Sequence, residues 1–90
     1  MYALSLDLPG MTEEQARAIE DEVGAETPQG LVAHVAGPYE GGWRIIDVWE
    51  SQAAQEKFAV EVLTPARERA GAGIAGTPDL RVVHSVLSRV

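Results

Sequence analysis

The chain has 90 residues, of which 46% are hydrophobic and 23% charged, a balance typical of a single globular domain spanning residues 1–90. Fourteen acidic and seven basic residues give a formal net charge of −7 without any cluster of lysines and arginines, so nucleic acids and anionic membrane surfaces are disfavoured as partners. The absence of cysteine excludes disulfides and thiolate metal sites, and the absence of a signal-like or membrane-spanning apolar stretch makes a cytoplasmic location the default expectation.

The first third of the chain predicts a strand followed by a helix. Residues 2–8 alternate with period two, and the Pro-Gly pair behind them is typical of a turn. Thr12 and Gln15 have the spacing of a capping box, which opens a short helix with a narrow apolar stripe. Gly24 should end this helix.

The middle of the chain predicts a β-hairpin. Residues 31–36 and 43–50 have strand patterns, and residues 37–42 between them are rich in glycine and proline. Because one short turn separates the two apolar runs, they should pair as antiparallel neighbours.

A second helix should follow, because Ser51 is a good N-cap and apolar residues then recur at every fourth position. These apolar residues are Ala54, Phe58, Val62 and Ala66. Pro65 lacks a backbone donor, so it should either kink this helix or end it and begin a new turn. Gly71 should close the helical region, and residues 80–87 predict a final strand.

This βαββαβ order predicts an α+β domain with the ferredoxin-like fold, in which two helices cover one face of a four-stranded antiparallel sheet. The strand at 43–50 is apolar on both faces, because Ile46 and Val48 alternate with Ile45 and the two tryptophans. A sheet that is apolar on both sides needs two covers, and the helices supply only one. We therefore expect a homodimer that forms a dimeric α/β barrel; the alternative is an open monomer with a partly apolar outer face.

The segment from Trp43 to Ser51 carries a pattern in which an acidic residue, a tryptophan and a serine alternate where a strand leads into a helix. Asp47, Trp49 and Ser51 supply these positions, and Phe58 follows on the helix. The pattern resembles the antibiotic biosynthesis monooxygenase-like (ABM) group of the dimeric α/β-barrel superfamily. This resemblance implies the dimeric ferredoxin-like fold. It also implies a range of activities: cofactor-free oxygenation of polycyclic phenols, quinol oxidation, haem degradation, isomerisation and cyclisation.

His34 and Asp47 are the candidate catalytic residues. His34 lies in an otherwise apolar strand, where an unpaired imidazole would be costly. If the hairpin loop has an even number of residues, His34 shares a face with Asp47 and should lie opposite Ile45; an odd loop would place it with Arg44. An imidazole beside a carboxylate is a candidate base that the carboxylate orients or charge-balances. The alternatives are a structural core histidine and a structural ion pair of Asp47 with His34, Arg44 or Arg81.

Four aromatic residues are candidates for substrate binding. Trp43 and Trp49 share one face of a strand and could form a flat wall for a planar ligand. Tyr39 in the predicted turn would cover such a pocket, and Phe58 would approach it from the helix. The alternatives are that the two tryptophans are core or interface material and that Tyr39 is simply exposed.

Two functions stay open at this point. One is a cofactor-independent monooxygenase, or a related cyclase or isomerase, that acts on a planar aromatic small molecule. The other is a non-catalytic dimeric module that binds a small ligand or serves assembly.

No cofactor or metal ion is expected. His34 and His84 are the two histidines, and they fall on opposite edges of the predicted sheet, roughly 14 Å apart at about 4.8 Å per strand. Residues 71–76 match G-x-G-x-x-G, but they follow a helix and precede a strand, the reverse of a nucleotide-binding context. Some ABM relatives carry a histidine on the second helix, where this chain has residues such as Phe58, Glu61 and Val62, which argues against haem degradation.

Overall fold

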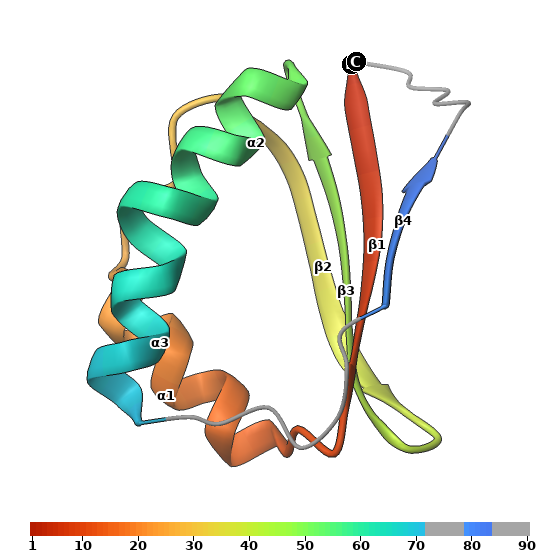
Figure 1. Cartoon of the computed structure of the whole chain (residues 1–90), viewed down its shortest axis with the longest axis vertical. Coiled ribbons are helices and arrows are strands. Elements are labelled where there is room, and N and C mark those ends of the chain that lie inside the picture. Colours follow the sequence, from red (N-terminus) through yellow and green to blue (C-terminus); the bar gives the residue numbers. More distant parts are fainter. Residues whose placement is uncertain (72–78, 84–90) are drawn as a thin grey trace.

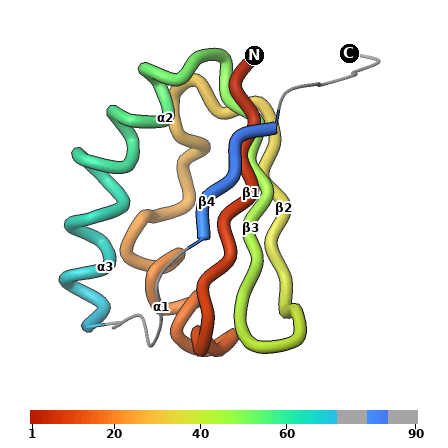
Figure 2. The backbone as a smooth tube through the Cα atoms, turned by 45° about the vertical axis from the view of Figure 1, so that its right-hand side comes forward, coloured from red at the N-terminus to blue at the C-terminus, as the bar shows by residue number. Residues whose placement is uncertain are grey.

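The predicted elements follow one another in the expected order in a computed structural model of the chain, which describes residues 1–71 and 79–83. In chain order they are β1 (Tyr2–Pro9), α1 (Glu13–Val23), β2 (Leu31–Tyr39), β3 (Gly42–Trp49), α2 (Gln52–Phe58), the π-helix η1 (Ala59–Leu63), α3 (Thr64–Ala70) and β4 (Asp79–Val83). The strands form one antiparallel sheet in the order β2-β3-β1-β4. The helices lie together on one face of this sheet (Figure 1), and a second view shows the same two layers (Figure 2). The ferredoxin-like α+β prediction is therefore confirmed.

Local signals begin and end the first helix as predicted. The Thr12 hydroxyl accepts a hydrogen bond from the Gln15 backbone N–H, and the Gln15 side chain accepts one from the Thr12 N–H. Gly24 terminates the helix with a φ of 95°, a value that favours glycine. None of the helices within 1–71 has both the length and the apolar character needed to cross a membrane.

Pro65 changes the geometry of the second helical region without ending it. The helix passes from α2 through one π turn into α3, and Pro65 lies in the first turn of α3. Thr64 donates both its backbone N–H and, over 2.9 Å, its hydroxyl to the Ala59 carbonyl. The wider turn therefore accommodates the residue that lacks a backbone donor.

The strand β2 is longer than predicted, and β3 keeps its predicted length but begins one residue earlier. The β2–β3 pairing continues to Tyr39 and Gly42, so the loop is reduced to Glu40 and Gly41. Gly41 has a φ of 109°, which a residue with a side chain rarely adopts. Pro38 is tolerated within β2 because β2 is an edge strand of this sheet.

The hydrophobic core gathers where β1 runs into α1. Leu8, Met11, Ile19, Trp43 and Ala66 are buried members of this cluster and come from β1, the β1–α1 turn, α1, β3 and α3. The Arg69 side chain also links α3 to α1 by donating to the Glu22 carboxylate over 2.8 Å. The helix layer is thereby fixed to the sheet at this end.

The other face of the sheet, which we call the outer face, is not covered by any described element (Figure 1). Val35, Ile46 and Val83 are exposed there. Beside them Arg44 donates to Asp7 over 2.6 and 2.9 Å. These hydrogen bonds hold the pKa of Asp7 below its ordinary value.

Candidate functional site

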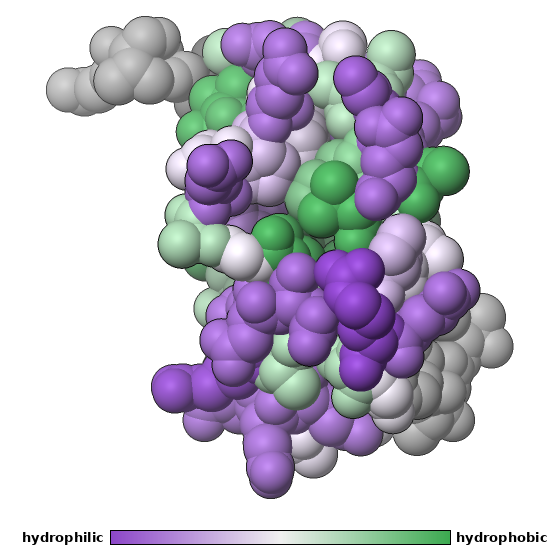
Figure 3. All heavy atoms as spheres, turned by 90° about the vertical axis from the view of Figure 1, so that its left-hand side faces the viewer, coloured by the Kyte–Doolittle hydropathy of each residue, from purple (hydrophilic) through white to green (hydrophobic). Residues whose placement is uncertain are grey.

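A cavity of about 490 Å³ lies between the helix layer and the sheet, and it is the candidate functional site. Leu4, Leu6 and Ile45 line it from the sheet, while Phe58 and Leu63 line it from the helical region. Viewed from the helix side, hydrophobic side chains appear between hydrophilic ones across the middle of the molecule (Figure 3). A largely apolar cavity with a few polar groups is the usual form of a small-molecule site.

His34 and Asp47 meet in this cavity. The two residues are direct partners in the β2–β3 register, and His34 Nδ1 lies 2.5 Å from Asp47 Oδ1. The His34 side chain is 40% exposed and that of Asp47 is 14% exposed, so the imidazole is the more accessible member. Because an ionised carboxylate only accepts, Nδ1 is the donor in this contact, and Nε2 is the ring nitrogen that the contact does not use.

The shared face of His34 and Asp47 is one of the two alternatives that the sequence left open, and the exact register differs from the expected one. The loop is even-numbered, as the shared face requires, yet Ala36 is the residue that lies opposite Ile45. His34 is displaced by two residues from its predicted partner, because the hairpin pairing extends through Tyr39 instead of ending near Ala36.

The two arginines considered as partners of Asp47 pair with other residues. Arg44 binds Asp7, and Arg81 donates to Asp79 over 2.6 Å. The register of the strands places both of these pairs on the outer face, opposite to the face of Asp47. His34 is therefore the partner of Asp47 that the fold selects.

Trp43, Trp49 and Phe58 all line the cavity. Trp49 is 1% exposed, and its ring lies 5.2 Å from that of Phe58 with an interplanar angle of 40°. The Trp49 indole nitrogen Nε1 is buried and has no hydrogen-bond partner among the residues within 1–71 and 79–83. The Trp49 N–H is therefore a buried donor that the described residues leave unused.

Tyr39 does not line the cavity, which corrects the expected set of binding residues. Its position in β2 places it on the outer face, where the Arg44 guanidinium lies 4.7 Å from the centre of its ring. The cause is again the long hairpin, since Tyr39 belongs to a strand and its side chain direction follows the strand alternation.

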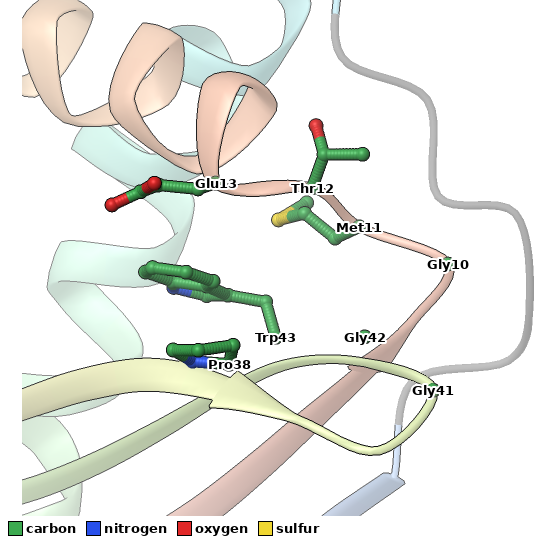
Figure 4. Close-up of a pocket in the computed structure, with 8 residues that line it drawn as sticks. All are labelled: Gly10, Met11, Thr12, Glu13, Pro38, Gly41, Gly42 and Trp43. Carbon is green, nitrogen blue, oxygen red and sulfur yellow. The ribbon is translucent and has the colours of Figure 1, made fainter.

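A second hollow, of about 360 Å³, lies where the hairpin loop meets the start of α1. Figure 4 shows the Trp43 ring between Pro38 and the Met11–Glu13 segment. Glu13 is the ionisable residue that lines this hollow, so it offers no pair comparable to His34 and Asp47. We therefore place the candidate site in the larger cavity.

Arg67 is a lining residue that the sequence reasoning missed. It lies on α3, four positions after Leu63, which also lines the cavity. This i,i+4 spacing was the available signal, and it was overlooked because Arg67 lies beside the apolar stripe rather than in it.

In the described part of the chain, no three histidine, aspartate or glutamate side chains gather as a metal site requires. His84 lies outside the described residues, as do residues 72–78 of the glycine-rich segment. The expected separation of His34 and His84 stays a prediction.

The fold of this chain is similar to the folds of several solved structures. No family model matches the chain, and no curated protein is similar to it in sequence. A protein assigned as an antibiotic biosynthesis monooxygenase from Caulobacter crescentus is similar in structure, with a TM-score of 0.70 and 16% identity over 96% of this chain and 90% of that chain. One with the same assignment from Chloroflexus aurantiacus has a TM-score of 0.65 and 16% identity over 97% of this chain and 96% of that chain.

A third similar structure is a protein of unknown function from Nitrosomonas europaea, with a TM-score of 0.66 and 15% identity over 99% of this chain and 92% of that chain. At these identities the likeness concerns the fold. The chain thus has the ferredoxin-like fold of antibiotic biosynthesis monooxygenase structures, and the resemblance noted in the sequence is confirmed at that level.

Proposed function

We propose that this protein binds a planar aromatic small molecule in the cavity and removes a proton from it, as a cofactor-independent monooxygenase or a related cyclase or isomerase. The observation that supports this proposal is the pairing of His34 Nδ1 with Asp47 Oδ1 in the wall of an apolar cavity. A base that is oriented by a carboxylate and faces such a space is suited to general-base catalysis. The fold shared with antibiotic biosynthesis monooxygenase structures also supports an oxygenase.

The residues divide the chemistry between them. His34 Nε2 accepts a proton from a phenol hydroxyl or an activated C–H group, and Asp47 stabilises the imidazolium that forms. Trp43, Trp49 and Phe58 pack against the aromatic ring of the substrate. Each of these roles uses a side chain that lines the cavity.

Oxygenation follows from the carbanion that the base creates. The carbanion transfers electrons to O₂, and a carbon–oxygen bond forms at the deprotonated carbon. Loss of water then cleaves the O–O bond, so that one oxygen atom stays as a quinone carbonyl and the other leaves as water with two hydrogens from the phenol. The substrate is the reductant, and O₂ is the oxidant. In a cyclase or isomerase, the same carbanion would attack a carbonyl or be reprotonated at another carbon.

A direct test follows both the proton and the oxygen. Polycyclic phenols absorb at longer wavelength as phenolates, so binding to the wild-type protein should produce the phenolate spectrum below the pH at which the free phenol ionises. Oxygen uptake with dihydroxynaphthalenes should fall by about 10²- to 10⁴-fold in His34→Gln. Arg17→Gln, an exposed change on α1, serves as the control. Binding without deprotonation or oxygen uptake would instead support a non-catalytic ligand-binding module.

We also propose that the protein is a homodimer joined through the outer face of the sheet. The apolar residues Val35, Ile46 and Val83 are exposed there. Beside them lie two arginine–aspartate ion pairs, whose positive and negative side chains a second copy could complement. Sedimentation should give twice the monomer mass for wild type and a monomer for Ile46→Lys. Val60→Lys, at an exposed position on η1, should stay dimeric. A wild-type monomer would contradict this proposal and leave the cavity proposal intact.

A further inference from the structure

Arg67 differs from the other described arginines in its pairing. Four arginines have a carboxylate oxygen within ion-pair distance: Arg17 with Glu13, Arg44 with Asp7, Arg69 with Glu22, and Arg81 with Asp79. Arg67 has no such partner in the described part of the chain. Residues 72–78 and 84–90 contain no aspartate or glutamate, so no acidic side chain there can supply one.

The position of Arg67 is not that of an ordinary surface arginine. Its side chain lines the cavity, its Nε is buried, and this nitrogen has no hydrogen-bond partner among the residues described. Glu20 of α1 lines the same cavity but is not within ion-pair distance of Arg67. A guanidinium keeps its charge at every physiological pH, so an unused buried N–H on it favours an anionic acceptor.

The geometry of the guanidinium selects the kind of anion. Its planar fork of N–H groups matches the two oxygens of a carboxylate in a bidentate pair. The chain as a whole carries a net charge of −7, so its general field repels anions. Any preference for an anionic ligand must therefore come from a local cation in the cavity.

We propose that the ligand of the cavity is a planar aromatic carboxylic acid whose carboxylate binds Arg67. This inference rests on the proposed function, because it names the substrate class of the same cavity. Arg67 lies on the helix layer, whereas His34 and Asp47 lie on the sheet. The carboxylate thus fixes one end of the ligand, and the reactive part of the ring faces His34.

The test compares two ligands that differ in charge but have nearly the same shape, 2-naphthoate and 2-naphthamide. Quenching of tryptophan fluorescence, corrected for ligand absorption, gives both dissociation constants. Wild type should bind naphthoate more tightly than naphthamide by a factor on the order of ten to a hundred. Arg67→Gln should abolish this preference by weakening naphthoate, while its affinity for naphthamide stays within about twofold of wild type.

Three further measurements complete the test. Arg17→Gln removes an exposed positive charge and should preserve the preference. Arg67→Lys keeps the charge without the planar fork and should retain part of it. Glu20→Gln removes a negative charge from the cavity wall and should tighten naphthoate binding alone. Circular dichroism of every variant establishes that the fold is retained.

Failure of this inference is distinct from failure of the proposed function. If wild type binds both ligands equally, or if Arg67→Gln keeps the preference for naphthoate, the carboxylate inference is wrong while the cavity remains a ligand site. If wild type binds neither naphthalene derivative nor any polycyclic phenol, both proposals are overturned.

Discussion

The buried indole of Trp49 allows a prediction in which two opposing effects can be compared. Trp49 is 1% exposed, and its Nε1 has no hydrogen-bond partner among the described residues. The substitution Trp49→Phe keeps an aromatic ring near Phe58 but removes the second ring and the N–H. The folded protein then loses packing, and it also loses an unfavourable buried donor.

The sizes of the two effects follow from the burial. The smaller ring buries roughly 40 Å² less surface, which at about 25 cal/mol per Å² destabilises the fold by about 1 kcal/mol. A buried donor without a partner costs about 1–3 kcal/mol, and the substitution removes that cost. We therefore expect the free energy of unfolding of Trp49→Phe to be unchanged or to rise by up to about 2 kcal/mol.

Trp43→Phe is the matched control. Trp43 is 8% exposed and has no buried N–H left without a partner, so its substitution removes packing alone. We expect a loss of about 1 kcal/mol and a melting temperature lower by about 4–8 °C. Thermal unfolding by circular dichroism at one protein concentration compares the two variants. A loss at Trp49 equal to or greater than that at Trp43 would refute the reasoning, because the Trp49 N–H would then have a partner in the folded protein.

Three further predictions concern the fold that supports the site. Because Arg44 holds the pKa of Asp7 below its ordinary value, the stabilisation from their pairing is present above the unfolded pKa and lost as the pH falls through the folded pKa. The acid loss of melting temperature below about pH 4 should be smaller in Asp7→Asn, and an identical acid profile would contradict this assignment. Gly42→Ala should strongly lower the stability against urea, because the added Cβ would overlap the backbone of β1. Gly37→Ala is the control and should leave the stability nearly unchanged, because its added Cβ meets free space. Equal losses of stability in the two variants would contradict the strand pairing. Ser51→Ala should cost about 0.5–2 kcal/mol in urea unfolding by removing the N-cap of α2, while Ser51→Asp should restore it.

The features that could be predicted from the sequence are those that local physical chemistry determines. The Thr12 capping box and the glycines that end helices act within a few residues, so their sequence patterns suffice. The alternation of Ile45 and Ile46 also separates the two faces of β3 without knowledge of its neighbours. These signals were enough for the element order and for the separation of the two faces of β3, but not for which face the helices cover.

The missed features depend on contacts between distant residues. Pro38 favours a turn in isolation, and only its place on an edge strand allows β2 to continue through it. That continuation sets the exact partner of His34 and moves Tyr39 out of the site. The role of Arg67 likewise depends on which acidic residues the fold leaves out of its reach, and periodicity carries no information on that.

The most direct test of the central claim is a titration of the purified protein with a polycyclic phenol such as 1-naphthol, followed by tryptophan fluorescence corrected for absorption. His34→Ala is titrated in parallel, with Val35→Ala as the control, because these neighbouring side chains lie on opposite faces of the sheet. We expect saturable quenching that His34→Ala weakens and Val35→Ala leaves unchanged. A flat titration of wild type with the whole series of phenols, or equal binding by wild type and His34→Ala, would contradict the claim that His34 faces the ligand in this cavity.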